Sequence, residues 1–194
     1  RVDGERLLCS LMKMGQVGRE GEGVNRLALN DANKEGRDLF TGWLRDEGLE
    51  VRVDQIGNIF GVREGTDRDK APVVVGSHLD TVREAGVFDG ALGVLSGLEI
   101  VRLLNQHDID TRRAVAVAAF TNEEGARFQP DMMGSMVYTG QLDVEKAWAA
   151  SRVSTEAERA SSSSALNCSS LPRLRSYPIQ TRSRAFQRRG RWNK

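Results

Sequence analysis

Two short apolar runs, each followed at once by polar side chains, constrain the fold of this chain more than any other feature. The first run, VVVGSHLDTV, contains His78 and Asp80 towards its far end. The second, AVAVAAF, leads into TNEE, which places Glu123 and Glu124 directly after it. Apolar runs of this length, rich in β-branched and small residues, predict buried strands. Functional groups in open α/β sheets gather at the carboxyl ends of strands, so we expect these four side chains at one edge of a sheet.

A further acidic position lies between the two runs. Asp89 occupies the segment VFDGALG, and residues 92–104 behind it carry apolar side chains at helical spacing. One imidazole and several carboxylates suit a divalent ion such as zinc or manganese. Two ions about 3.5–4 Å apart need a bridging carboxylate, a part that Asp89, followed by Gly90, can take. Glu123 and Glu124 would face opposite ways on a regular strand, but at a strand end they can converge, one as ligand and the other as base.

Each of these positions also has a simpler interpretation. A His-x-Asp pair is common by chance, and adjacent glutamates usually lie on a solvated surface. The glycine after Asp89 is also what a tight turn needs. Residue spacing alone therefore leaves a metal site and an ordinary surface both open.

The rest of the first 150 residues predicts a mixed α/β fold. Periodicity and turn residues predict helices over residues 5–14, from about 31 to near 48 and over 142–150, and strands at 50–53 and 58–62. Asn30 or Asp31 is the expected N-cap of the second helix. Glycines break the chain between residues 16 and 23. The order helix, strand, strand, strand, helix, strand predicts helices packed on a mixed sheet.

Several conspicuous side chains are expected to have structural roles rather than catalytic or metal-binding ones. Trp43 belongs to the apolar stripe of the second helix and is expected in the core. Met132, Met133 and Met136 follow the glutamates and are expected to pack beneath the site. His107, the only other histidine, lies in the polar segment NQHDID and is expected on the surface.

Composition indicates a globular protein without a membrane span. Of the 194 residues, 39% are hydrophobic and 28% are charged, and no run of 18 apolar residues occurs. The first six residues lack the apolar core of a signal peptide. Cys9 and Cys168 lie far apart and outside any metal-binding pattern, so we expect free thiols in a reducing, cytoplasmic environment.

Three segments, in this order and at this spacing, resemble a known metal-binding core. GSHLDTV, FDGALGVLSGLE and TNEEGARF are similar to the core of the N-carbamoyl-L-amino-acid hydrolase and allantoate amidohydrolase family, within the aminoacylase-type metallopeptidase superfamily. The upstream segment NRLALNDANKEGRDLFTGWLRDEGLEVRVDQIGNIFGVREG resembles the start of that family. The resemblance covers about residues 20–142. It implies an α/β fold that is the N-terminal part of a three-layer zinc-exopeptidase-like catalytic domain with a mixed sheet, the second (dimerisation or lid) domain being absent.

Carried over residue by residue, the resemblance implies a site for two divalent ions, zinc or manganese. His78 would be a ligand of one ion, Glu124 a ligand of the other, and Asp89 the carboxylate that bridges them. Glu123 would be the general base that takes a proton from the attacking water. Asp80 would orient the imidazole of His78 from outside the ligand set. The implied substrate is a small ureido compound, either an N-carbamoyl-L-amino acid or allantoate.

Arg127 and Phe128 match the EEGxRF pattern of the same family. The resemblance implies a structural role for both beneath the site rather than contact with substrate. An aminoacylase or peptidase elsewhere in the superfamily is the alternative enzyme. The segment FDGALG argues against that alternative, because those peptidases carry a more glycine-rich segment around the aspartate.

The character of the chain changes near residue 152. Residues 151–194 carry ten Lys or Arg, two Glu and ten Ser, whereas residues 1–150 carry 18 basic and 25 acidic residues. We therefore expect a partial metallohydrolase catalytic domain over 1–150 and a basic, Ser/Arg-rich tail over 151–194 whose composition favours disorder. The family would continue through a further catalytic half, a dimer-forming domain and two more ligand histidines, yet no histidine follows His107.

Three interpretations of this tail compete. Its arginines can contact nucleic-acid phosphates, which makes a non-catalytic, nucleic-acid-binding fragment the alternative from another functional class. It can also be a plain solvated tail. We favour a third hypothesis, a reading frame that slips after about residue 152: TRSRAF can be encoded by ACA AGG TCC CGT GCT TTN, which one base later reads Gln-Gly-Pro-Val-Leu, a stretch typical of the family. The chain alone is then expected to bind metal weakly and to turn over little substrate.

Overall fold

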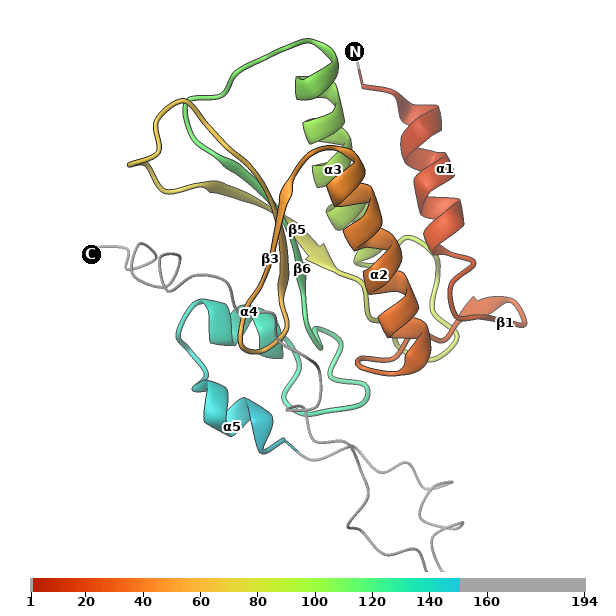
Figure 1. Cartoon of the computed structure of the whole chain (residues 1–194). Helices are drawn as coiled ribbons and strands as arrows, with labels where there is room; N and C mark the ends of the chain where they lie inside the picture. Colours follow the sequence, from red (N-terminus) through yellow and green to blue (C-terminus); the bar gives the residue numbers. More distant parts are fainter. Residues whose placement is uncertain (1, 151–194) are drawn as a thin grey trace, which may run out of the picture.

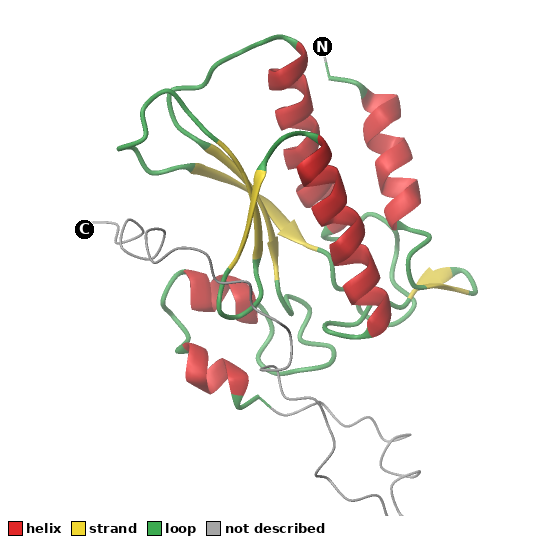
Figure 2. Cartoon of the chain, viewed as in Figure 1, coloured by secondary structure: helices red, strands yellow, loops and turns green. Residues whose placement is uncertain are grey.

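A four-stranded mixed sheet organises the part of the chain that the computed structural model describes, residues 2–150 (Figures 1 and 2). The strands lie in the order β3 (Glu50–Val53), β4 (Ile59–Arg63), β6 (Val115–Phe120) and β5 (Val73–His78). β3 pairs antiparallel with β4 and β4 antiparallel with β6, whereas β5 runs parallel to β6. The predicted α/β class with a mixed sheet is confirmed, and the parallel pair makes the segments after β5 and β6 leave the same edge of the sheet.

Gly76 determines how closely β5 approaches β6. It lies opposite Ala118 in the strand register, and a Cβ atom at this position would collide with the main chain of Ala118. Two residues later the same register places His78 beside Phe120. The glycine that the sequence places before Ser-His is therefore a packing requirement of the strand pair.

Three helices cover one face of the sheet: α1 (Gly4–Met14), α2 (Asp31–Asp46) and α3 (Ala91–Gln106) (Figure 1). α3 packs on β5 and β6, α2 on β3 and β4, and α1 on α3. The side chains of Asp3 and Asn30 cap α1 and α2 by accepting hydrogen bonds from main-chain amides of the first turn. Asn30, rather than Asp31, is thus the N-cap of the second helix.

The main core lies between these helices and the sheet. Because side chains alternate along a strand, Val117 of β6 points into this core while its neighbour Ala116 points to the other face. Trp43 packs against the core from α2, which confirms the prediction for it. His107 is the C-cap of α3 and is exposed, as expected.

An aromatic cluster and two short helices occupy the other face. Phe60 and Phe120 meet Tyr138, with the Phe60 and Tyr138 ring centroids 5.2 Å apart. Tyr138 ends α4 (Met133–Tyr138), which packs against α5 (Val144–Trp148). The two helices lie near the end of the sheet from which the loop after β6, with Glu123 and Glu124, leaves (Figure 1).

The methionines after the glutamates do not all behave as predicted. Met133 is fully buried and Met136 is partly buried, but Met132 is half exposed, so the prediction that it packs beneath the site is wrong. Met132 is the N-cap of α4 and has a left-handed backbone conformation with a φ of 50°. Met132 is not among the residues of the apolar cluster that its neighbour Met133 joins.

The glycine-rich segment after α1 contains a small hairpin that the sequence pattern does not predict. β1 (Arg19–Glu20) and β2 (Gly23–Val24) are only two residues long, too short to show an alternating pattern. Val24 also exchanges two main-chain hydrogen bonds with Ala85, so this segment is attached to the loop after β5. Cys9 is a free, exposed thiol.

The remaining expectations concern residues outside the described part. The disorder, nucleic-acid contacts and shifted frame of the tail, and the state of Cys168, all fall beyond residue 150. Within residues 2–150, no helix combines the length and apolar character that crossing a membrane requires.

Candidate metal centre

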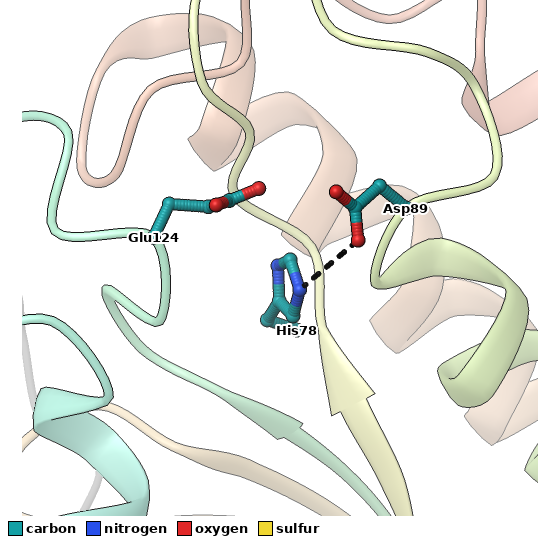
Figure 3. A group of neighbouring side chains, drawn as sticks. All are labelled: His78, Asp89 and Glu124. Carbon is teal, nitrogen blue, oxygen red and sulfur yellow. Dashed lines mark ion pairs between the residues drawn. The ribbon is translucent and has the colours of Figure 1, made fainter.

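His78 ends β5 and is buried, with 4% of its surface exposed. Its Nδ1 lies 2.9 Å from the main-chain oxygen of Asp80. A carbonyl oxygen can only accept a hydrogen bond, so Nδ1 carries a proton and donates it in a hydrogen bond to Asp80. The other ring nitrogen, Nε2, lies 3.8 Å from Oδ1 of Asp89 (Figure 3). It also lies 3.3 Å from Oε2 of Glu123.

Asp89 lies on the loop immediately before α3, and its side chain is 67% exposed. The next residue, Gly90, is the N-cap of α3 and has a φ of 62°. A Cβ atom on Gly90 would lie 2.5–2.6 Å from three atoms of the His78 ring. Glycine at this position therefore serves both the turn and the close approach of the main chain to the imidazole.

Glu123 and Glu124 lie on the loop that follows β6. Asn122 turns the chain there with a φ of 52°, which asparagine tolerates better than most residues. Its Nδ2 donates to the carbonyl oxygens of Phe128, at 2.9 Å, and Pro130, at 3.1 Å, and so closes the loop behind the glutamates. Sequence reasoning missed this role. The available signal was an asparagine at a strand end directly before two acids.

Asp80 connects the two strand ends in a way that differs from the sequence expectation. Its carbonyl oxygen, not its carboxylate, contacts the His78 ring, since the carboxylate Oδ1 is 3.9 Å from Nδ1. The other carboxylate oxygen accepts a hydrogen bond from the main-chain amide of Glu124 at 3.2 Å. Asp80 thus holds the imidazole through its main chain and the glutamate loop through its side chain.

The electrostatics of the cluster are those of acids crowded in a site that is partly withdrawn from water. Burial raises the pKa of Asp80, and the opposing effects of His78 and of main-chain amides are smaller. Burial also raises the pKa of Glu124. The charge of His78 opposes this rise, whereas the charges of the neighbouring acids Asp89, Glu123 and Asp80 add to it. A cation at this position would relieve both the desolvation and the mutual repulsion.

The donor set fits a divalent metal ion. His78, Asp89 and Glu124 each offer one ligand atom, and these atoms all lie within 4.8 Å of one another (Figure 3). Two side-chain oxygens of the cluster, Asp80 Oδ1 and Glu124 Oε1, are buried without a hydrogen-bond partner. One imidazole nitrogen with carboxylate oxygens is a ligand set that zinc and manganese accept.

Arg127 and Phe128 have the structural contacts that were expected of them. Nη1 of Arg127 donates to the carbonyl oxygen of Ala28 at 2.9 Å, and its guanidinium lies 5.2 Å from the centre of the Phe128 ring. Phe128 packs against the cluster that contains Met133. His107, by contrast, lies at the far end of α3 from the site.

Fold and site together define an α/β chain with a histidine and carboxylate metal-type centre at the edge of a mixed sheet. Residues 58–162 match the sequence model of Peptidase family M28. The chain is 49% identical over 150 residues to an N-carbamoyl-L-amino-acid amidohydrolase of Rhizobium meliloti, covering 77% of this chain and 36% of that protein. It is 35% identical over 140 residues to allantoate deiminase 1 of Glycine max, covering 71% of this chain and 29% of that protein.

A solved structure agrees with these relatives. A hydantoinase/carbamoylase family amidase from Burkholderia ambifaria superposes with a TM-score of 0.77 and 50% identity, covering 78% of this chain and 37% of the other. The chain therefore belongs to peptidase family M28. Its similarity to these relatives and to the solved structure confirms the resemblance to the N-carbamoyl-L-amino-acid hydrolase and allantoate amidohydrolase (hydantoinase/carbamoylase) proteins. It spans about a third of the length of the curated relatives that it matches.

Proposed function

We propose that this chain is part of the catalytic domain of a dinuclear-metal amidohydrolase that cleaves the C–N bond of a carbamoyl or ureido group. The observation that carries the proposal is the convergence of His78, Asp89 and Glu124, whose ligand atoms lie within 4.8 Å of one another. Relatives named as N-carbamoyl-L-amino-acid amidohydrolases and allantoate deiminases indicate the substrate class, a small ureido compound.

In this proposal the residues of the cluster divide the work. His78 and Glu124 would each hold one of two ions, zinc or manganese, and the exposed Asp89 would be shared between the two ions. Such ions would supply a Lewis acid for the ureido oxygen and would lower the pKa of a bound water to about 7. The main-chain oxygen of Asp80 keeps the proton of the imidazole on Nδ1, so that Nε2 stays free to coordinate.

Glu123 is the proposed general base. Its Oε2 lies 3.3 Å from Nε2 of His78, and its side chain is 34% exposed, so it borders both the cluster and solvent. A carboxylate in this place can take the proton of the attacking water and deliver it to the leaving nitrogen. Hydrolysis of a carbamoyl group in this way releases ammonia and carbon dioxide and leaves the amino acid.

The proposed activity is that of a protein as long as the matched relatives. Residues 2–150 supply one histidine to the cluster, and the chain spans about a third of the matched relatives. We therefore expect the 194-residue chain alone to bind metal weakly and to hydrolyse little or no substrate.

Metal analysis and hydrolysis assays test the proposal. Zinc and manganese binding should fall in Asp89→Asn and Glu124→Gln, whereas Glu123→Gln should bind metal and lose the residual hydrolysis of N-carbamoyl amino acids or allantoate. Hydrolysis of a dipeptide panel instead would support the peptidase or aminoacylase alternative. Metal binding that is unchanged in Asp89→Asn and Glu124→Gln would contradict the proposed centre.

A further inference from the structure

Arg26 is a buried cation to which the proposed mechanism gives no part. It is 1% exposed, and burial lowers the pKa of its guanidinium to about 10. Its side chain donates three hydrogen bonds, all to main-chain carbonyl oxygens: Nε to Leu79 at 2.6 Å, and Nη1 to Met14 and Val17, both at 2.9 Å. Burying a guanidinium is costly unless its donors are used, so a structural requirement must favour arginine here.

That requirement lies in the segment between the strand and the site. Leu79, which accepts the shortest of the three hydrogen bonds, stands between His78 and Asp80. On the other side of Asp80, the main chain of Arg26 makes two hydrogen bonds with Thr81. Its amide donates to Oγ1 of Thr81 at 2.9 Å, and its carbonyl oxygen accepts from the amide of Thr81 at 3.0 Å. Arg26 therefore holds the residues on both sides of Asp80.

The guanidinium is itself fixed from two directions. Met14 and Val17 lie at and just beyond the C-terminus of α1, where carbonyl oxygens lack partners within the helix and favour a cation. On the other side α2 approaches closely, since a Cβ atom on Gly36 would lie 2.8 Å from Cδ of Arg26. A planar fork of several donors suits this arrangement, and the single ammonium of lysine does not reproduce it.

We propose that Arg26 is a positioning residue of the metal centre. By fixing residues 79–81 it holds the carbonyl oxygen of Asp80 against Nδ1 of His78. That contact selects the tautomer whose Nε2 faces Asp89 and Glu123. The inference rests on the proposed role of His78 as a ligand, but it predicts a property of the imidazole that exists without metal.

The two histidines of the chain make this property measurable. In a His107→Gln background, the imidazole ¹⁵N signals of the 194-residue chain come from His78 alone. A long-range ¹H–¹⁵N spectrum recorded at alkaline pH distinguishes the two neutral tautomers of the ring. The parent should show the Nδ1–H form, and adding Arg26→Met should yield a mixture with Nε2–H.

Zinc affinity, measured by competition with a chromophoric chelator, is the second readout. Arg26→Met should lower it about 10- to 100-fold, the loss typical of residues that orient a ligand. Arg26→Lys keeps a long cationic side chain but loses the fork, so it should restore neither the tautomer nor the affinity.

Two further variants separate positioning from general stability. Arg63→Met removes another partly buried arginine, which donates to Asn105 Oδ1 and the Ile109 carbonyl at the opposite end of the sheet, so it should lower the thermal midpoint without changing the tautomer. Gly36→Ala displaces the Arg26 side chain without removing its charge, and should shift the tautomer in the same direction as Arg26→Met.

The tautomer decides the inference. If Arg26→Met and Gly36→Ala lower the thermal midpoint but leave His78 as the Nδ1–H form with the parent's zinc affinity, the inference is overturned. Should Arg26→Met fail to fold, an unchanged tautomer in folded Gly36→Ala overturns it equally. A third outcome separates the two proposals. If the parent shows the Nδ1–H form and both variants lose it, but the parent binds no zinc, the proposed metal function is refuted and the positioning role is upheld.

Discussion

The main-chain amide of Glu124 donates a hydrogen bond of 3.2 Å to Oδ2 of Asp80 and thereby joins the ends of two parallel strands. This contact fixes the distance between the loop after β5, which follows the histidine, and the loop after β6, which bears the glutamates. The geometry of the cluster therefore depends on a residue that is not among its three ligand donors.

Asp80→Ala should uncouple metal binding from stability. The variant loses the hydrogen bond from the Glu124 amide, so zinc affinity should fall about 10- to 100-fold. Because burial raises the pKa of the Asp80 carboxyl, removing it should cost the metal-free chain little stability. Chelator competition measures the zinc affinity, and urea unfolding measures the stability. Asp69→Ala, which removes an exposed carboxylate, is the control. Equal zinc affinities in the two variants would show that the contact does not order the site.

Gly90→Ala should damage the site by steric means. The added methyl group would lie 2.5–2.6 Å from the His78 ring in a backbone conformation with a φ of 62°. We expect a loss of about 1–3 kcal/mol in the free energy of unfolding together with weaker zinc binding. Gly86→Ala is the matched control on the same loop, since a Cβ atom there meets nothing within 4 Å. Similar stability of both variants would mean that the loop moves freely away from the ring.

Asn122→Asp should open the glutamate loop. Aspartate tolerates the same positive φ, but a carboxylate cannot donate to the carbonyl oxygens of Phe128 and Pro130. Leaving buried groups unpaired costs about 1–3 kcal/mol, which urea unfolding can detect. Asn122→Gly preserves the turn but removes the side chain, so its free energy of unfolding should lie between those of the parent and Asn122→Asp. An Asp variant as stable as the parent would contradict the proposed closing role.

Glu99→Gln should loosen the attachment of α1. Glu99 is 2% exposed and receives two hydrogen bonds from Arg6, at 2.6 and 2.9 Å, across the contact between α1 and α3. Loss of this charge-assisted pair should lower the free energy of unfolding by about 1.5–3 kcal/mol. Asp38→Asn, which breaks the exposed Lys34 pair, should cost about 0.5 kcal/mol or less. Equal effects of both changes in urea unfolding would refute the assignment.

Asp54→Asn should change how stability depends on pH. Burial raises the pKa of Asp54 in the folded chain, so the folded state holds its proton more tightly than the unfolded state, where an aspartate titrates near 3.9. The contribution of Asp54 is therefore fully present below about pH 3.9 and is lost as pH rises through the higher folded value. The stability deficit of Asp54→Asn relative to the parent should shrink over this rise, as measured by urea unfolding at successive pH values. A deficit that grows with pH would mean that the ionised form is the favoured one.

The sequence predicted those parts of the fold that depend on local pattern. β5 and β6 follow from their apolar residues, and the meeting of His78 with Glu123 follows from parallel strands that end at one edge of a sheet. The hairpin of β1 and β2 was not predictable, because two-residue strands contain no periodicity.

The supports of the site depend on packing between distant segments. Arg26 reaches the carbonyl of Leu79, 53 residues away, only because the end of α1 and the loop after β5 flank it. The contact of the Asp80 carbonyl with the imidazole depends in turn on the path of that loop. A histidine and an acid two residues apart identify the pair, but not which oxygen of Asp80 is used.

The close approach of β5 to β6 at Gly76 has a consequence for how the centre is assembled. Alternation along β5 means that a shift of one residue in its pairing would carry the imidazole to the opposite side of the sheet, away from every acid of the cluster. A larger side chain at 76 would thus threaten coordination without touching a ligand. The selectivity of strand pairing during folding is in this respect the first determinant of whether a metal can be bound at all.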